Sequence, residues 1–307
     1  MGTRKSDHAV MVLAAALAFV PVIAAAQAYP SRPIRIIVPF APGGGTDAFA
    51  RPIAAQLDTQ LGQRILIENK AGAAGSIGAV EVKNAKPDGY TFLFAPSSTH
   101  AINPTAFVKP AYDAVKDFTP VSSVCVNPLV LVTHPSMPDS VMGLVELMKK
   151  NPGKYSYASS GNGSILHLAA EYFKREVGGM EVEHIPYKGS APALMGLIRG
   201  DVQILIANVP SLKPAIDGKQ IRPVALTSLE RSPQLPELRT AHESGLPGFE
   251  VIVWYGLFAP AGTPEAVIGK LSAELRRIAA LPDVRRKLQE QGADPLTATP
   301  REFAQRI

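Results

Sequence analysis

Three consecutive glycines follow an apolar run near the start of the chain, a pattern typical of an anion site. The run from Ile34 to Phe40 has the length of a buried strand, and Gly43–Gly45 come shortly after it. Glycine adopts positive φ without strain and lets the backbone approach a ligand closely. Thr46 or Asp47 is then placed to cap a helix. Such a unit exposes backbone N–H groups beside the positive end of a helix dipole, so we expect it to hold a small carboxylate.

A second unit of the same form lies further along the chain. A predicted strand at 155–159 leads through Ser160-Gly161-Asn162-Gly163-Ser164 into a predicted helix at 165–177, with His167 in its first turn. We expect the two glycine loops to act on one ligand. Lys188 follows another predicted strand, at 183–187. It either meets an anion or lies in solvent at the end of that strand.

A polar segment at 95–104 follows a third predicted strand, at 90–95. In open α/β sheets, ligands bind just outside the carboxyl ends of the strands. The segment therefore contributes further candidates for ligand contact, namely Ser97, Ser98, Thr99 and His100. The alternative is an ordinary loop whose hydroxyl groups bond within the loop.

The first glycine loop also has a competing interpretation as a dinucleotide site. Gly43 to Ala48 fits the pattern G-x-G-x-x-A after a strand, and Glu68 ends the second predicted strand about 20 residues on, where a ribose-binding acid belongs. Pro42 and Pro52 fit this pattern poorly, and an exported protein meets little nicotinamide cofactor. The phosphate-binding loop pattern is absent, because no Lys-Ser or Lys-Thr follows the glycines.

Catalytic and metal-binding patterns are weak. Ser164 and His167 are three residues apart on one predicted helix, but no G-x-S-x-G motif surrounds the serine. A capping serine and a cleft histidine explain them better than a nucleophile does. The other histidines show no metal-ligand spacing, and Cys125, the only cysteine, is expected to be a small buried residue. We expect no enzyme activity, no cofactor and no metal.

The elements that would position these residues follow an α/β pattern. Strand, helix, strand, helix and strand alternate up to residue 95, which predicts a mostly parallel sheet. Gly62 should end the first helix, and Pro52 predicts a kink or a later start for it. Two strongly β-prone runs, at 121–133 and 249–259, are expected to cross between two domains. The segment from Thr299 is typical of a helix start, and the chain stops within that element.

Composition and the N-terminus point to an exported protein. The chain has 307 residues, of which 46% are hydrophobic and 19% charged, which suits a folded protein of two domains. Residues 1–28 combine basic residues, a short apolar run and small residues before a cleavage point, so we predict a secretory signal and a periplasmic protein. A membrane anchor is disfavoured because the run is short and holds Pro21. The net charge of +5 is scattered, which argues against a nucleic-acid partner.

Six motifs occur in an order that marks a family resemblance: VPFAPGGGTD, ENKAGAAGSIGA, KPDGYTFLFAPSS, YASSGNGS, HIPYKGSAPAL and WYGLFAPAGTP. With them the chain resembles the receptors of tripartite tricarboxylate transporters, the Bug-type periplasmic binding proteins, from Tyr29 to Ile307. The resemblance implies a two-lobed, type II-like fold with a mostly parallel sheet in each lobe and two crossing strands. It implies a small carboxylate between the lobes, membrane permease subunits as partners, and a monomer. A dinucleotide-dependent oxidoreductase and a ligand-sensing subunit of a signalling system remain as alternatives.

The resemblance also implies lobe boundaries and ligand contacts. Residues 29–127 and 248–307 would form the first lobe, and residues 128–247 the second. The implied contacts are Phe40, Pro42, Gly44, Gly45, Thr46, Asp47, Ser97, Ser98, His100, Ser159, Gly161, Asn162, Gly163, Ser164, His167, Tyr187, Lys188 and Asn208. Two departures from the family pattern stand out. Ala207 occupies a position where many members carry Asp, and the C-terminus is short by about one helix.

Overall fold

The structure is a computed structural model that describes residues 29–307. Its contacts divide the chain into Met1–Ser31 and Arg32–Ile307. Of the first unit, only residues 29–31 are described, and they form no helix or strand. The predicted secretory signal, residues 1–28, lies outside the described residues. Within residues 29–307, no helix is both long and apolar enough to cross a membrane.

The first lobe is built on a sheet that begins with three parallel strands. β1 (Ile34–Val38) lies between β2 (Ile65–Asn69) and β3 (Thr91–Pro96), and β9 (Ile252–Pro260) continues the sheet antiparallel to β3. The helices that connect these strands are α2 (Gly45–Leu61) and α3 (Ser76–Lys83). As predicted, Gly62 ends α2, in the left-handed conformation with φ 65°.

The second lobe repeats the scheme. Its parallel strands are β5 (Ser156–Ser159), β6 (Glu183–Pro186) and β7 (Ile204–Asn208). A further strand, β8 (Arg222–Leu226), pairs antiparallel with β4 (Phe118–Thr133). Its helices are α5 (Val141–Lys150), α6 (Ile165–Glu176), α7 (Ser190–Arg199) and α8 (Val209–Asp217). Ser140 caps α5 and Ser164 caps α6, each accepting a hydrogen bond from a backbone N–H of the first turn.

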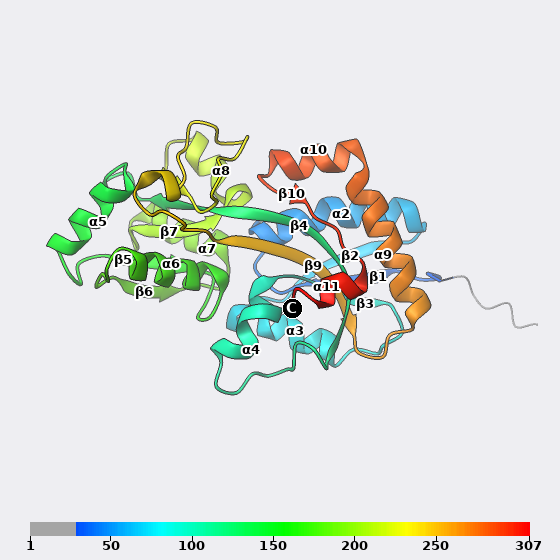
Figure 1. The fold of residues 1–307 in the computed structure, drawn as a ribbon. Helices are drawn as coiled ribbons and strands as arrows, with labels where there is room; N and C mark the ends of the chain where they lie inside the picture. The colour runs from blue at the N-terminus through cyan, green and yellow to red at the C-terminus, as the bar shows by residue number, and fades with distance from the viewer. Residues whose placement is uncertain (1–28) are drawn as a thin grey trace, which may run out of the picture. The chain divides into compact units, whose positions relative to one another are not determined.

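Two long strands connect the lobes, as the sequence predicted. β4 (Phe118–Thr133) pairs with β9 up to Pro128 and with β7 from Leu129 onward. It is therefore shared by both sheets, and Figure 1 shows β4 and β9 running together between the two groups of elements. This is the expected α/β architecture of two lobes. The predicted boundaries at residues 127/128 and 247/248 stay a prediction.

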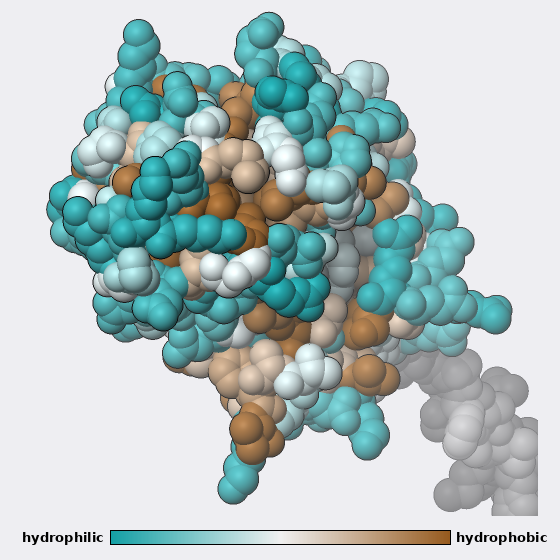
Figure 2. All heavy atoms as spheres, turned by 60° about the vertical axis from the view of Figure 1, so that its left-hand side comes forward, coloured by the Kyte–Doolittle hydropathy of each residue, from teal (hydrophilic) through white to brown (hydrophobic). Residues whose placement is uncertain are grey.

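The C-terminal elements complete the first lobe. They are α9 (Glu265–Ala280), α10 (Pro282–Glu290), β10 (Asp294–Pro295) and α11 (Pro300–Ala304). The predicted capping box of α11 is present, with Thr299 and Glu302 each bonding the other's backbone N–H. Phe303 of α11 is fully buried in a core cluster with Leu93 and Phe258. Figure 2 shows a face whose protruding side chains are mostly hydrophilic, with hydrophobic ones mainly in the hollows between them.

Two local expectations were wrong. Helix α2 begins at Gly45 with Gly44 as its N-cap, so neither Thr46 nor Asp47 caps it. Pro52 lies inside this helix, which excludes the later start, while the kink stays a prediction. Residues 98–106 are helical, as η2 (Ser98–Ile102) and α4 (Asn103–Ala106), where a loop was expected. Helix α8 begins at Val209, directly after β7, because proline fits the first turn of a helix. The remaining short helices are η1 (Ala73–Gly75) and η3 (His242–Ser244).

Candidate ligand-binding site

A small cavity lies where the predicted loops of both lobes meet. Its volume is about 20 Å³. It is lined by Phe40, Gly44, Gly45, Thr46, Pro96, Ser98, Ser160, Ile165, Leu166, Ser190, Asn208 and Tyr255. A space of that volume holds roughly one water molecule. A metabolite therefore enters only when the two lobes separate.

Four helices begin at this cavity. Gly45, Ile165 and Ser190 are the first residues of α2, α6 and α7, and Asn208 is the N-cap of α8. Each helix N-terminus carries a partial positive charge of roughly half an elementary charge and leaves backbone N–H groups without helical partners. The four N-termini therefore contribute positive partial charge at the cavity.

The side chains of the lining agree with that character. Within the described part of the chain, the lining includes no lysine, arginine, aspartate, glutamate or histidine. Hydroxyl groups come from Thr46, Ser98, Ser160, Ser190 and Tyr255, and an amide comes from Asn208. An apolar portion comes from the side chains of Phe40, Pro96, Ile165 and Leu166. Neutral donors and helix N-termini bind an anion, and the apolar portion can accept a hydrocarbon body.

Asp47 shapes the first loop instead of facing the cavity. It is 4% exposed, and its carboxylate accepts hydrogen bonds from Arg51, from the Asn69 amide and from the Gly43 N–H, the last at 3.1 Å. Burial alone raises the pKa of Asp47, but these hydrogen bonds outweigh it and hold the pKa below its ordinary value. The carboxylate thus fixes the turn from which Gly44 and Gly45 reach the cavity.

Asn208 joins the lobes at the floor of the cavity. Its amide nitrogen donates to the Tyr255 hydroxyl at 2.7 Å, and Tyr255 lies on the crossing strand β9. Burial raises the pKa of Tyr255 well above its ordinary value, so the phenol keeps its proton. Tyr255 also packs edge-on against Phe49 of α2, with ring centroids 4.9 Å apart.

Other contacts between the lobes surround the cavity. The Ser98 hydroxyl accepts the N–H of Ile165 at 3.0 Å, and the N–H of Ala41 donates to the Lys188 carbonyl at 3.4 Å. Glycines make the approach possible. A Cβ on Gly45 would lie 2.5 Å from Asn208, and one on Gly44 would lie 2.9 Å from the Ser190 hydroxyl.

The second glycine loop is held by two histidines behind it. The Ser164 hydroxyl accepts the backbone N–H of His167, which confirms the predicted capping serine. The imidazole of His167 accepts the N–H of Gly163 at 3.2 Å. Ser159 is fully buried, and its hydroxyl lies 2.6 Å from Nε2 of His184. These residues support the cavity wall and do not line it.

The remaining predicted contacts lie further away. Pro42, Asn162 and Lys188 are exposed beside the loops and do not line the cavity. Gly161 and Gly163 instead meet the first lobe, where a Cβ on either would lie 3.3 Å from Ala74 or Phe107. The ring of Tyr187 packs against Gly196 of α7. Ser97 is buried, and its hydroxyl has no hydrogen-bond partner within residues 29–307.

His100 is buried behind the cavity. It is 1% exposed, and its ring stacks on Phe258 at 3.6 Å between centroids. Burial lowers its pKa to about 3, so the imidazole is neutral. Its Nδ1 lies 2.8 Å from the Thr99 hydroxyl, and its Nε2 has no partner among the described residues.

The residues required for the alternative chemistries are engaged elsewhere. Glu68, the candidate ribose-binding acid, accepts hydrogen bonds from Nε and Nη2 of Arg35 at 2.7 and 2.9 Å and does not line the cavity. Within residues 29–307, no group of three or more His, Cys, Asp or Glu side chains is placed to hold a metal ion. Cys125 is fully buried, as predicted.

Six residues that line the cavity were not predicted from the sequence as ligand contacts. They are Pro96, Ser160, Ile165, Leu166, Ser190 and Tyr255. The sequence holds a usable signal for Ser190, because Gly189 precedes it shortly after the predicted strand at 183–187; Gly189 is the N-cap of α7 and adopts φ 151°. Tyr255 had none, because its place at the cavity depends on how the crossing strand packs on α2.

Comparisons with known proteins agree with this architecture. A family model described as tripartite tricarboxylate transporter family receptor matches residues 49–307. Protein BugT of Bordetella pertussis is 38% identical over 277 residues, which cover 90% of this chain and 85% of that protein.

Two solved structures from Rhodopseudomonas palustris are similar throughout. Rpa4515 with adipate has a TM-score of 0.88 at 37% identity, covering 91% of this chain and 93% of that one. MatC with bound malate has a TM-score of 0.85 at 34% identity, and the match covers 90% of this chain and 95% of MatC. By the family match and these likenesses, the chain belongs to the tripartite tricarboxylate transporter receptor family, the Bug-type periplasmic binding proteins.

Proposed function

We propose that this protein is a periplasmic receptor that captures a small organic carboxylate between its lobes and delivers it to the permease of a tripartite tricarboxylate transporter. The observation that carries the proposal is the convergence of four helix N-termini on one cavity whose lining, among the described residues, includes no cationic side chain. That arrangement favours a carboxylate through oriented N–H groups and hydroxyls. The relatives with bound adipate and malate support the same ligand class.

The energy required is within reach of such a site. A micromolar ligand needs about 8 kcal/mol of binding free energy. A charge-assisted hydrogen bond contributes on the order of 1.5–3 kcal/mol, and a helix N-terminus adds about 0.3–1, or up to about 2 when partly buried. Four or five donors shared by a carboxylate reach that total without an arginine. Because the donors come from both lobes, the ligand also favours the closed form.

Thermal shift tests the ligand class. The purified protein is heated with adipate, malate, citrate or benzoate, and with adipamide as the uncharged control. At about 100 times its Kd, a ligand of the folded state stabilises by about 2.7 kcal/mol. For a chain of this size that is a rise in Tm of roughly 5 °C. If no organic anion raises Tm, the proposed ligand class is wrong.

Location and delivery need separate experiments. Osmotic shock of cells that express the full chain should release the protein with periplasmic markers. The permease subunits should co-purify with it more strongly when the ligand is present. Co-purification of a membrane kinase instead would favour the sensing alternative.

A further inference from the structure

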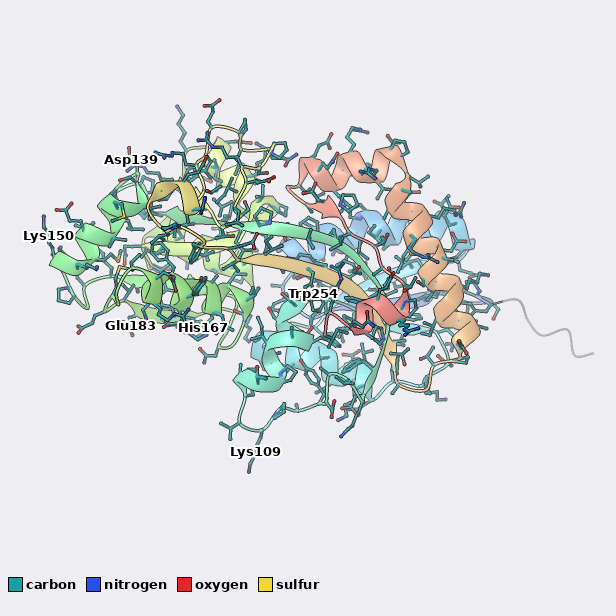
Figure 3. The ribbon with its side chains drawn as sticks, viewed as in Figure 1. Lys109, Asp139, Lys150, His167, Glu183 and Trp254 are labelled. Carbon is teal, nitrogen blue, oxygen red and sulfur yellow. The ribbon has the colours of Figure 1, made fainter. Side chains whose placement is uncertain are left out.

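Two stacked histidines lie directly behind the second binding loop, residues 159–164. His167 of α6 and His184 of β6 have ring centroids 4.1 Å apart and planes inclined by 17°. Tyr157 of β5 stacks on His184 at 4.8 Å. Neither histidine lines the cavity, and Figure 3 shows His167 on α6 within the second lobe. The stack thus belongs to the support of the loop and not to its ligand-facing surface.

Each histidine is bonded to a different point of the loop. Nδ1 of His167 accepts the N–H of Gly163 at 3.2 Å. Nε2 of His184 lies 2.6 Å from the Ser159 hydroxyl, which accepts the N–H of Gly161 at 3.1 Å. The loop passes through two glycines at positive φ, Gly161 at 124° and Gly163 at 78°, and imidazole rings hold this path from behind.

The bond from Gly163 requires an unprotonated Nδ1. A neutral imidazole nitrogen can accept a hydrogen bond, whereas both nitrogens of an imidazolium are donors. A proton on Nδ1 of His167 would face the N–H of Gly163, and one of the two groups would have to move. Ser160 on the loop and Ile165 just after it both line the cavity. The N–H of Ile165 also donates to Ser98 of the first lobe.

The surroundings of the stack favour the neutral form. Burial lowers the pKa of both rings, and that of His184 falls to about 4. The charged groups that face the stack come from α6 itself: Glu171 raises and Lys174 lowers the pKa of His167. Glu171 is paired with Lys174 at 2.7 Å and accepts a hydrogen bond from the Tyr157 hydroxyl. The first lobe presents Phe107 to Gly163.

We propose that His167 is a positioning residue for ligand binding: its neutral ring holds Gly163 in the binding loop, and protonation of the ring releases the loop and lowers ligand affinity. This inference rests on the proposed function, because it concerns the same cavity. It adds that capture of the carboxylate is linked to pH through a residue that does not touch the ligand. Below the pKa of His167 in the free protein, affinity should fall about tenfold per pH unit.

The first experiment needs no ligand. Long-range ¹H–¹⁵N NMR spectra of the full protein report which imidazole nitrogen carries the proton. We expect His167 to be protonated only on Nε2 at pH 7.5, and we expect the Gly163 amide resonance to titrate with the His167 ring. The proposal would be overturned by a proton on Nδ1 at pH 7.5, or by a Gly163 amide chemical shift that does not change as the His167 ring titrates.

The second experiment measures Kd for adipate and malate from pH 7.5 to 5. His167→Asn keeps an acceptor at the position of Nδ1 and takes up no proton, so at pH 7.5 it should recover part of the affinity that His167→Leu loses, and its pH slope should be shallower than that of the wild type. His167→Leu should bind more weakly at every pH. The ratio of wild-type to His167→Asn affinity cancels protonation of the ligand itself.

The chain offers a matched control. Nδ1 of His242 accepts the N–H of Gly248 at 2.9 Å on the exposed surface, so His242→Asn repeats the substitution away from the cavity. This variant should keep the wild-type pH profile. Parallel pH profiles of the wild type and His167→Asn would refute the linkage. If no carboxylate binds the wild type at pH 7.5, the proposed function fails, and the NMR experiment still decides whether His167 holds the loop.

Discussion

At the scale of single residues, Gly45 sets how closely the lobes can approach. A Cβ at this position would lie 2.5 Å from the side chain of Asn208, and the backbone there does not need positive φ. Gly45→Ala should therefore leave the fold intact and obstruct closure. Overpacking costs about 1–3 kcal/mol, which predicts an affinity about 5- to 150-fold weaker by calorimetry.

Gly269→Ala is the matched control for this substitution. Gly269 lies within α9, and a Cβ there meets nothing within 4 Å. Its affinity should equal that of the wild type, and its stability should rise slightly, because alanine favours a helix. Wild-type affinity in Gly45→Ala would mean that ligand binding does not need the closed contact between Gly45 and Asn208.

His100 gives the fold a dependence on pH that is separate from ligand binding. Its pKa is lowered by burial to about 3, against about 6.5 in the unfolded chain. The neutral ring contributes stability in full above about pH 6.5. As pH falls from there towards 3, His100 takes up a proton in the unfolded chain but stays neutral in the folded protein. The free energy of unfolding therefore falls by up to about 1.4 kcal/mol per pH unit.

The pH dependence contributed by His100 is tested with His100→Gln. Urea unfolding measures the unfolding free energy of the wild type and the variant between pH 7.5 and 4.5. We expect the difference in unfolding free energy between wild type and variant to shrink as pH falls, because glutamine does not titrate. Comparing the two proteins removes the contribution of the carboxyl groups that they share. A difference that stays constant with pH would show that His100 is not held neutral.

At the scale of elements, the helical turn after β3 links the lobes through one hydroxyl. Ser98 begins the π-helical segment η2, and its hydroxyl accepts the N–H of Ile165 at the start of α6. Ser98→Ala should remove this bond from the closed form only. A hydrogen bond contributes about 0.5–1.5 kcal/mol, so affinity should fall about two- to tenfold.

A buried serine elsewhere serves as the control for Ser98→Ala. Ser272 of α9 is 1% exposed, and its hydroxyl has no hydrogen-bond partner among the described residues. Ser272→Ala should leave the affinity unchanged. Unfolding free energies of all three proteins, measured without ligand, separate closure from folding. A large loss of stability in Ser98→Ala would place the role of this hydroxyl within the first lobe.

Elements whose signals are local could be predicted from the sequence. Strand β1 is an apolar run, α5 and α6 begin at capping serines, and Gly62 ends α2 by taking the left-handed conformation. The two crossing strands could be predicted as well, because each is a long β-prone run far from any helix pattern. In every case the decisive residues are neighbours in the chain.

Features that depend on distant packing could not be predicted. The turn at η2 is held by the Tyr112 hydroxyl, which donates to the Thr99 carbonyl from 13 residues away. Tyr255 and Ser190 reach the cavity only because two lobes close on it. His100 fitted the expected contact loop in sequence, yet aromatic packing against Phe258 turns it into the core. The sequence indicated the loops that meet at the cavity but could not show which of their side chains line it.

At the scale of the whole molecule, closure must be a movement about the crossing strands. β4 leaves β9 at Pro128, which has no N–H to extend the ladder, and β9 begins at Ile252, paired with that proline. These positions are few and adjacent, as in hinges that absorb a change of backbone angles. The cavity of about 20 Å³ cannot admit a dicarboxylate unless this hinge opens.

Spin labels can measure that movement, because the one native cysteine does not interfere. Cys125 is fully buried, and burial raises the pKa of its thiol, so it reacts slowly with labels. Two pairs of exposed positions are suitable for labels (Figure 3). The pair between the lobes is Lys109 of the first lobe and Glu183 of the second, and the control pair within the second lobe is Lys150 and Glu183. Each pair is made by substitution to cysteine.

The expected result follows from rigid lobes and a flexible hinge. Without ligand, the distribution of distances between labels at Lys109 and Glu183 should be broad or should have a long mean. Adipate or malate should shorten the mean distance by several ångströms as the loops close on the carboxylate. The distance between Lys150 and Glu183 should not change, because both lie in one lobe. A distribution between Lys109 and Glu183 that stays the same while calorimetry shows binding would mean that the ligand enters by another route. The closed contacts of Gly45 and Ser98 would then be permanent parts of the fold, and their substitutions would act on stability instead of affinity.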